Sequence, residues 1–436
     1  MPIVFAFDFD GVVLDSLVSL RETYFDFLNN YNKDGSDWEF EQLNGPNINE
    51  ILLILKKRYE IKETIAEMHM RYMGLLHENY RHSELVEGVL DCLNLLRTRN
   101  VDVALVTSSI RSQVDEILCH LDISHFFNVI ICGSDVQKSK PSPDIYIEFR
   151  RKFLNYDFYA IEDSENGLAS ALSAGIRTIF YDPQNKGTPK FVFARVNSMK
   201  SLKIRIEEIL NGCCVLEETS DIQFIFENHV PSLDSNVASA IDSIWKETSI
   251  NSNVFDDDVL YYSKHFTKSD MCYLYVFWGP YRYFYAMSQD PSLKLPFVPL
   301  SVSGICENES RCLIVGRRQN ATEYQGKLEF VPSGGLSREF YIDGEVRYHQ
   351  QLINEYVSET TSNSDSINSI RTLGVVMDLK HSVIDIGCVI QTNLVEKKSF
   401  NDSKEYTNIQ WLNLLELDSY TLIPSSRALY NLYLHR

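Results

Sequence analysis

The stretch IVFAFDFDGVVLDS, residues 3–16, decides the architecture expected for the first half of this chain. It begins with apolar, branched and aromatic residues and then reaches Asp8 and Asp10, a pattern that predicts a short buried strand. Gly11 follows at once and allows the backbone to turn sharply. Two carboxylates two residues apart at a strand exit mark this edge of the sheet as the place where we expect chemistry.

Helix and strand patterns alternate after an insertion that is helical from about Leu17 to Tyr80. The expected strands are VDVALVTSS (101–109), FNVIICGS (127–134), FYAIEDS (158–164) and RTIFYDP (177–183). Alternation of this length specifies a parallel sheet with right-handed crossovers and helices on both faces. We therefore predict an α/β domain that carries an all-α insertion at approximately 16–86.

The alternation fades after Pro183, and a chain of 436 residues is long for one core. The segment 201–214 predicts a last helix and LEETSD (216–221) a polar connector, which places a boundary near Glu218. Beyond it, 300–318 and 375–393 each read as two apolar runs around a turn, as in β-hairpins. The prediction is two domains, 1–218 and 219–436, the second of the α+β class.

Composition narrows the classes of function. A net charge of -19 without a concentrated basic face argues against nucleic-acid binding. No stretch reaches the ~18 uninterrupted apolar residues of a membrane span, and the N-terminus lacks a basic signal-peptide region. We expect a soluble cytoplasmic protein whose nine scattered cysteines are reduced.

Three more polar elements follow at or near predicted strand ends, namely Thr107, Lys140 and the pair Glu162-Asp163. Taken singly, each has an ordinary structural alternative, as a strand residue, a solvated lysine or a helix N-cap with its first-turn acid. Their order along one edge of one predicted sheet favours a shared site. A carboxylate nucleophile with a second acid nearby suits group transfer, and crowded carboxylates suit Mg²⁺.

The segments FDFDGVVLDS, LVTSS, SKPSPDIY and IEDSENGLASALSAG resemble the four motifs of the haloacid dehalogenase superfamily, over roughly residues 1–195. The resemblance implies a Rossmann-like core with an α-helical C1 cap, the lid that sets substrate choice. It also implies Mg²⁺-dependent hydrolysis of a small phosphomonoester, a sugar or polyol phosphate, through an aspartyl-phosphate. A sugar phosphomutase of the same superfamily and a non-catalytic nucleotide-sugar-binding regulator are the alternatives.

The resemblance also assigns roles. Asp8 attacks phosphorus, and Asp10 protonates the leaving oxygen and then activates water. Thr107 binds the phosphoryl oxygens, Lys140 neutralises charge, and Ser108 adds a main-chain phosphate contact. The implied Mg²⁺ ligands are Asp8, the Asp10 main-chain carbonyl, Asp163, and Glu162 directly or through water. Asp10 disfavours the dehalogenase reaction, because a proton shuttle at that position serves phosphoryl transfer to and from oxygen.

The segment 301–336, which ends in Gly334-Gly335, resembles the Nudix superfamily, and the likeness extends loosely over 225–436 to relatives that cleave UDP-glucose. The family signature, GX5EX7REUXEEXGU, is altered here. If QQLINE occupies its helix, the metal-ligand positions hold Gln351, Asn354 and Glu355. An amide is a weaker ligand than a carboxylate and no base, so we expect binding of a nucleotide sugar, or a structural role, over its cleavage. Arg317, Arg318 and Glu355 are the expected ligand residues, with salt bridges as the alternative role of the arginines.

Overall fold

The computed structural model describes the chain apart from residues 44–47, 81–82, 185–190, 229, 252–255, 269–270, 291–292, 294, 320–323, 397–399 and 435–436, and apart from the side chains of 41 and 248–251. The described chain divides into two compact units, Met1–Ile204 and Arg205–Arg436. Among the described helices, none is both long and apolar enough to cross a membrane.

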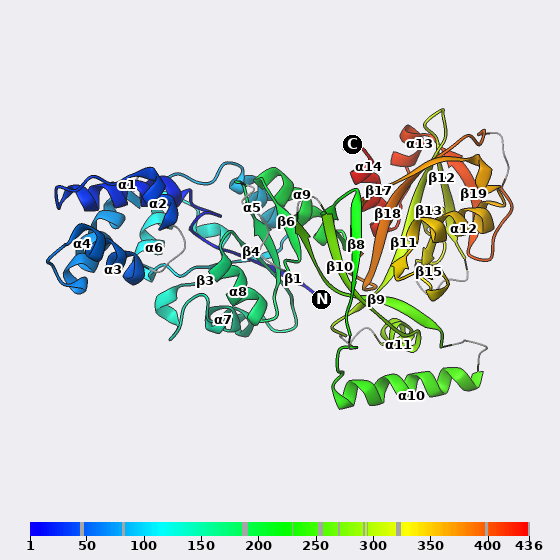
Figure 1. Ribbon diagram of the computed structural model, residues 1–436, viewed down its shortest axis with the longest axis horizontal. Helices are drawn as coiled ribbons and strands as arrows, with labels where there is room; N and C mark the ends of the chain where they lie inside the picture. The colour runs from blue at the N-terminus through cyan, green and yellow to red at the C-terminus, as the bar shows by residue number, and fades with distance from the viewer. Residues whose placement is uncertain are drawn as a thin grey trace. The chain divides into compact units, whose positions relative to one another are not determined.

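The first unit is built on one parallel sheet of order β3-β2-β1-β4-β5-β6 (Figure 1). Its strands are β1 (Ile3–Phe7), β2 (Asp102–Val106), β3 (Val129–Ile131), β4 (Asp157–Glu162), β5 (Arg177–Tyr181) and β6 (Ala194–Val196). The central β1 is buried from Val4 to Phe7 because it lies between β2 and β4 with helices on both faces. This confirms the predicted parallel α/β sheet, to which β6 adds a strand that the sequence did not predict.

Helices connect these strands. They are α5 (Val89–Thr98), α6 (Arg111–His120), α7 (Asp144–Lys152) and α8 (Glu165–Ser173), with short 3-10 turns η1 (Ser124–Phe126) and η2 (Gly133–Asp135). Helix α9 (Met199–Leu210) follows β6 and contains the division between the two units. A core of small and aromatic side chains forms where α7 and α8 cover the sheet, with Ala6, Ala104 and Ala160 at its centre and Phe149 against them. Because the strands are parallel, their carboxyl ends share one edge, and the polar motif residues follow there.

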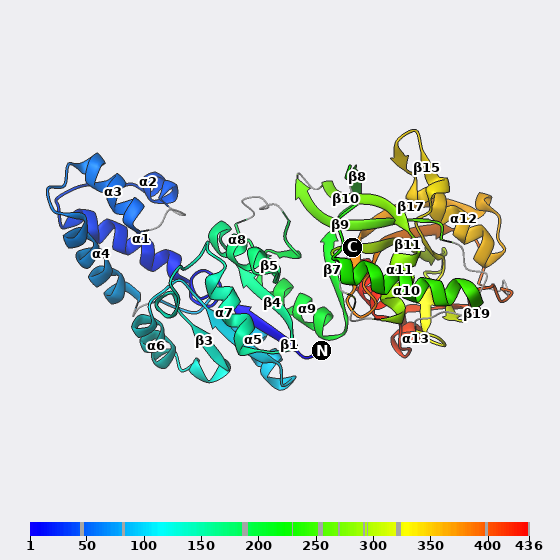
Figure 2. The same cartoon turned by 90° about the horizontal axis from the view of Figure 1, so that it is seen from below.

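The insertion between β1 and β2 is all-helical, as predicted. It comprises α1 (Ser16–Asn29), α2 (Asp37–Gln42), α3 (Ile48–Tyr59) and α4 (Ile65–Tyr80), which group together in both views (Figures 1 and 2). Helices α1 and α4 pack along each other, with Phe27 of α1 edge-on to Tyr72 of α4. We call this group of four helices the cap.

The second unit contains a mixed eleven-stranded sheet whose main path is β7-β17-β18-β11-β9-β10-β8. Its strands are β7 (Cys213–Glu218), β8 (Asp221–Phe226), β9 (Asp258–Lys268), β10 (Met271–Pro280), β11 (Val298–Glu307), β12 (Leu313–Arg318), β13 (Leu328–Phe330), β14 (Ser333–Gly335), β17 (Ile367–Asp378), β18 (Val383–Thr392) and β19 (Tyr406–Leu412). The pairs β11–β18 and β8–β10 are parallel, whereas β17–β18 and β11–β12 are antiparallel. Both predicted hairpins are thereby confirmed.

The helices of the second unit are α10 (Ser235–Asn251), α11 (Arg282–Gln289), α12 (Tyr348–Thr360), α13 (Leu414–Asp418) and α14 (Pro424–Leu434), with η3 (Arg338–Phe340), η4 (Ser364–Ser366) and a small hairpin of β15 (Tyr341–Ile342) and β16 (Glu345–Val346). Helix α12 lies against β14 and β11, and α14 lies against β17 and β7. Helices α10 and α11 pack together through Trp245, Tyr281 and Tyr285 (Figure 2).

The predicted connector 216–221 is wrong. Residues Cys213–Leu216 are buried and form most of β7, which pairs antiparallel with β17 inside the second unit. The apolar run CCVL is short enough to be read as a helix end, but strand pairing with β17 satisfies its backbone and buries its side chains. The second unit therefore begins at Arg205, before the Glu218 boundary that the sequence suggested.

Candidate active site

Asp8 is the first residue beyond β1, and its backbone N–H donates to the carbonyl of Ile161 at 3.0 Å. Asp8 is 7% exposed, and its Oδ1 accepts from the Phe9 N–H at 2.8 Å and contacts Lys140 Nζ at 2.8 Å. The lysine also contacts Glu162 Oε1 at 2.7 Å and donates to the Val106 carbonyl at 2.8 Å. A buried cation thus joins the ends of β1, β2 and β4.

Asp10 follows Asp8 by two residues and is held by hydroxyl groups. Tyr80 Oη donates to Asp10 Oδ1 at 2.8 Å, and Ser109 Oγ donates to Asp10 Oδ2 at 2.8 Å. Gly11, at φ +78°, makes the turn that separates Asp10 from the linker into the cap. The two carboxylates therefore have different environments: Asp8 lies beside a lysine, and Asp10 lies among the neutral hydroxyl groups of Tyr80, Ser109 and Ser16.

Asp8, Glu162 and Asp163 form a cluster in which one carboxylate oxygen from each lies within 4.8 Å of the others. Oxygen ligands of this kind suit Mg²⁺. Lys140 occupies Oε1 of the fully buried Glu162, and Tyr146 donates to the same oxygen. Glu162 Oε2 has no hydrogen-bond partner among the described residues. An unpartnered buried oxygen beside two more carboxylates fits a divalent cation.

The protonation behaviour of the cluster follows from this crowding. Burial raises the pKa of Asp163 to about 8, and the charge of Asp8 adds to the rise. Burial and then Asp8 also raise the pKa of Glu162 well above its usual range. Burial opposes the charge of Lys140, but Asp8 and Glu162 raise its pKa overall. The same repulsion between carboxylates is what a bound cation would relieve.

Thr107 and Ser108 follow β2 and reach the same edge. Thr107 is 1% exposed, its N–H donates to the Ile131 carbonyl at 3.0 Å, and its Oγ1 accepts from the Ser109 N–H at 3.0 Å. Ser108 is exposed, and its Oγ accepts from Ser139 at 2.8 Å. The structure therefore brings Asp8, Asp10, Thr107, Ser108, Lys140, Glu162 and Asp163 to one edge of the sheet.

Three contributors to this edge were not predicted from the sequence. Ser109 continues the run Thr107-Ser108, so its neighbours could have indicated it. Tyr146 lies in the segment SKPSPDIY, beside the lysine it helps to place. Tyr80 is the last residue of α4, 70 residues after Asp10 in the sequence, and no sequence pattern connects the two.

The candidate residues of the second unit serve mainly its own framework. Arg318 pairs with the buried Glu329 at 3.2 Å, and Arg317 donates to the Gly326 carbonyl at 3.1 Å. Gln351, 2% exposed, accepts from the Ser337 N–H at 2.9 Å and donates to the Gly335 carbonyl. Asn354 is exposed, whereas Glu355 is half-buried beside Gly334. The side-chain amide of Gln351 thereby joins the segment after the glycine pair to α12.

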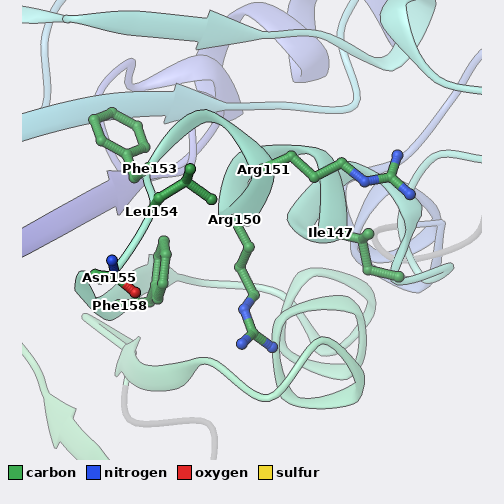
Figure 3. A pocket seen from close by; sticks show the side chains of 7 residues that line it. All are labelled: Ile147, Arg150, Arg151, Phe153, Leu154, Asn155 and Phe158. Carbon is green, nitrogen blue, oxygen red and sulfur yellow. The ribbon is translucent and has the colours of Figure 1, made fainter.

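A surface hollow lies elsewhere on the first unit, between α7 and the start of β4 (Figure 3). It is lined by Ile147, Arg150, Arg151, Phe153, Leu154, Asn155 and Phe158. Arg150 stacks over Phe158 and donates to the Ala174 carbonyl at 2.8 Å, which gives this arginine a structural role. Since the hollow is at the amino end of β4, it is separate from the carboxylate cluster at the other end.

Comparison with known proteins gives one family match. The sequence model of the haloacid dehalogenase-like hydrolase family matches residues 5–181. Over 181 residues the chain is 30% identical to the phosphorylated carbohydrates phosphatase of Thermotoga maritima, which covers 40% of this chain and 82% of that protein. Over 122 residues it is 30% identical to phosphoglycolate phosphatase of Escherichia coli strain K12, covering 26% of this chain and 48% of that protein. Among solved structures, CbbY of Rhodobacter sphaeroides in complex with phosphate is 24% identical, covers 46% of this chain and 96% of that chain, and has a TM-score of 0.41.

Proposed function

This chain belongs, through its first unit, to the haloacid dehalogenase-like hydrolases, and we propose that it is a Mg²⁺-dependent phosphatase acting on a small sugar or polyol phosphate. The observation that carries the proposal is the Asp8 carboxylate at the end of β1, with Lys140 Nζ 2.8 Å from its Oδ1 and Asp10 two residues away. The relatives named for phosphorylated carbohydrates and phosphoglycolate support the substrate class.

In the proposed reaction, an Asp8 oxygen forms a bond to phosphorus while the bond from phosphorus to the substrate oxygen breaks. Asp10 gives its proton to that leaving oxygen, so the product departs as an alcohol. Water then bonds to phosphorus, Asp10 takes one proton from it, and the bond from Asp8 to phosphorus breaks. Asp8 returns as a carboxylate and Asp10 as an acid, ready for the next turnover.

The surrounding residues provide charge and position. Lys140 offsets the negative charge of Asp8 and of the incoming phosphoryl oxygens, and Thr107 with Ser108 offers donors to those oxygens. Asp8, Asp163 and Glu162, with the Asp10 carbonyl, would hold Mg²⁺. When bound, the metal supplies positive charge to the phosphoryl oxygens.

The decisive variant is Asp8→Asn, which keeps the shape of the side chain but removes the nucleophilic carboxylate. Phosphate release from a panel of sugar and polyol phosphates should fall by at least about 10⁴-fold. Asp91→Asn, an exposed acid at the start of α5, is the matched control and should keep full turnover. Unchanged turnover in Asp8→Asn would refute the proposal.

A sugar phosphomutase would use the same site. It would interconvert two sugar phosphates without net phosphate release and would require a bisphosphate activator. Product analysis by phosphorus NMR separates the two, since only the phosphatase accumulates inorganic phosphate. A purely regulatory protein would bind these compounds and turn over none of them.

For the second unit we propose that a divergent Nudix-like domain binds a nucleotide sugar without cleaving it. The support is Gln351, whose amide both donates and accepts at the backbone beside the glycine pair, a pairing that a carboxylate cannot make. Arg317, Arg318 and Glu355 are the proposed ligand contacts. If this unit did cleave the ligand, a sugar 1-phosphate would be released for the first unit to dephosphorylate.

Calorimetry with UDP-glucose and Mg²⁺ tests this second proposal. Saturable binding without release of glucose 1-phosphate is the expected result. Release of glucose 1-phosphate would overturn the binding-only assignment, and the absence of any binding heat would refute the ligand class.

A further inference from the structure

The side chain of Asp10 is held from two different parts of the first unit. Ser109 belongs to the sheet edge after β2, whereas Tyr80 is the last residue of α4 and so belongs to the cap. Tyr80 is 5% exposed and places its hydroxyl 2.8 Å from Asp10 Oδ1. Ser16, the first residue of α1, adds a further side-chain hydrogen bond to Asp10, so part of the hold on this acid comes from the cap.

These bonds leave Asp10 able to transfer a proton. An ionised carboxylate offers about four lone-pair positions, two on each oxygen. Tyr80, Ser109 and Ser16 use three of them, so one position stays available for the proton. The hydroxyl groups fix the rotation of the carboxyl plane without blocking proton transfer.

Tyr80 lies where the cap joins the core. The linker after Gly11 and the segment after the cap run side by side: Asp15 N–H donates to the Glu84 carbonyl at 2.9 Å, and Val86 N–H donates to the Val13 carbonyl at 3.0 Å. The Ser19 and Ser83 hydroxyl groups add a bond of 2.6 Å between α1 and the second linker. This backbone pairing holds the segment after α4 beside the residues that follow Asp10.

We propose that Tyr80 is a positioning residue that aligns Asp10 for proton transfer. This inference rests on the proposed phosphatase function. A hydroxyl bond of this length weakens steeply once the oxygens separate.

The test uses two substrates that differ in their need for an acid. Glycerol phosphate has a poor leaving group that must be protonated, whereas p-nitrophenyl phosphate has a good one that leaves as an anion. In Tyr80→Phe, kcat/KM for glycerol phosphate should fall about 10-fold, a part of the effect of general acid catalysis. For p-nitrophenyl phosphate, kcat/KM should change less than about twofold. This parameter includes only the steps up to formation of the aspartyl-phosphate, and there the leaving group needs no proton.

The same variant should slow the second step, in which Asp10 accepts a proton from water. A rapid burst of p-nitrophenolate, equal to the enzyme concentration, should therefore precede a slower steady rate. Ser109→Ala, which removes another hydroxyl donor to Asp10, should show the same selective loss. Tyr72→Phe, at a second buried tyrosine of α4, should leave both substrates unchanged.

Equal losses on both substrates in Tyr80→Phe, or no loss on either, would overturn the inference. Asp8→Asn separates this failure from failure of the function itself. If Asp8→Asn abolishes turnover while Tyr80→Phe acts equally on both substrates, the phosphatase stands and only the role of Tyr80 falls. If Asp8→Asn retains turnover, both fall.

Discussion

In each unit of this chain, a glutamate side chain lies where a Cβ atom on a nearby glycine would be. A Cβ atom on Gly167 would lie 1.7 Å from Glu162 Oε2, and one on Gly334 would lie 2.6 Å from Glu355 Oε1. In the first unit Lys140 bridges Glu162 and Asp8. In the second unit Arg318 is paired with Glu329, and the helix position one turn before Glu355 holds Gln351. The first cluster therefore combines its acids with a shared lysine, whereas in the second unit the arginine is paired with another acid.

The acidic side chains of α12 in the second unit are nevertheless costly to bury. Burial raises the pKa of Glu359, on the same helix as Glu355, well above its usual range, and the charges of Glu405 and Glu355 add to the rise. Glu359 accepts from the Ser333 N–H at 3.2 Å through one oxygen, and the other has no hydrogen-bond partner among the described residues. The two units thus differ in charge balance more than in the number of acids.

Removal of divalent cations gives the largest expected contrast between the units. Because Asp8, Glu162 and Asp163 repel one another in a buried cluster, EDTA should lower phosphate release by about 10³-fold or more, and added Mg²⁺ should restore it. Binding heats for Mg²⁺ should weaken in Asp163→Asn. If EDTA leaves the rate unchanged, the first cluster works without a metal and the contrast disappears.

The glycine contacts give the next largest effect. In Gly167→Ala the new methyl group would displace Glu162 and with it Lys140, so turnover should fall about 100-fold, as expected for misplacement of catalytic groups by about 1 Å. Gly334→Ala, the matched change in the second unit, should leave phosphate release unaltered. Equal turnover in the two variants would show that Glu162 tolerates displacement.

Gln351→Glu tests whether the second unit tolerates a carboxylate at this metal-ligand position of the Nudix signature. The change removes the amide donor to the Gly335 carbonyl and buries a negative charge, so the free energy of unfolding of the second unit should fall by about 3 kcal/mol. Urea titration of the full chain measures it. Gln350→Glu, exposed on the same helix, is the control, and a stable Gln351→Glu would contradict the structural role of the amide.

The smallest expected effect is a pH dependence at His265 in β9. Burial lowers the pKa of His265 from 6.5 to about 4, so the folded chain keeps this side chain neutral where the unfolded chain takes up a proton. Its contribution to stability is complete above pH 6.5 and is lost as the pH falls toward 4. Between pH 7 and 5 the loss should be about 1–2 kcal/mol.

The check is the difference between wild type and His265→Phe, because the other titrating groups act equally in both. The wild type should lose more stability than the variant on acidification. His120→Asn, at an exposed histidine of the first unit, should follow the wild type. Parallel stability curves for wild type and His265→Phe would contradict the neutral buried histidine.

The sequence predicted that the candidate residues of the first unit lie close together because parallel strands bring their carboxyl ends to one edge. Asp8, Thr107 and Asp163 each stand just after a strand, so strand prediction alone placed them together. The Tyr80 contact with Asp10 escaped prediction because it depends on how a helix returns to the core. In the second unit, local pattern identified the hairpins and α12, but the role of Gln351 depends on backbone groups that no sequence spacing shows.

The two adjoining linkers have a consequence for how such a protein can diversify. Since the chain leaves and re-enters the core at neighbouring points, residues 17–79 form a cassette that insertion or exchange can replace without moving β1 or β2. New substrate preferences can then arise in one segment while the reactive groups are inherited intact. The hydroxyl at position 80 marks the boundary of that freedom, because a replacement cassette would have to end on a residue that still reaches Asp10.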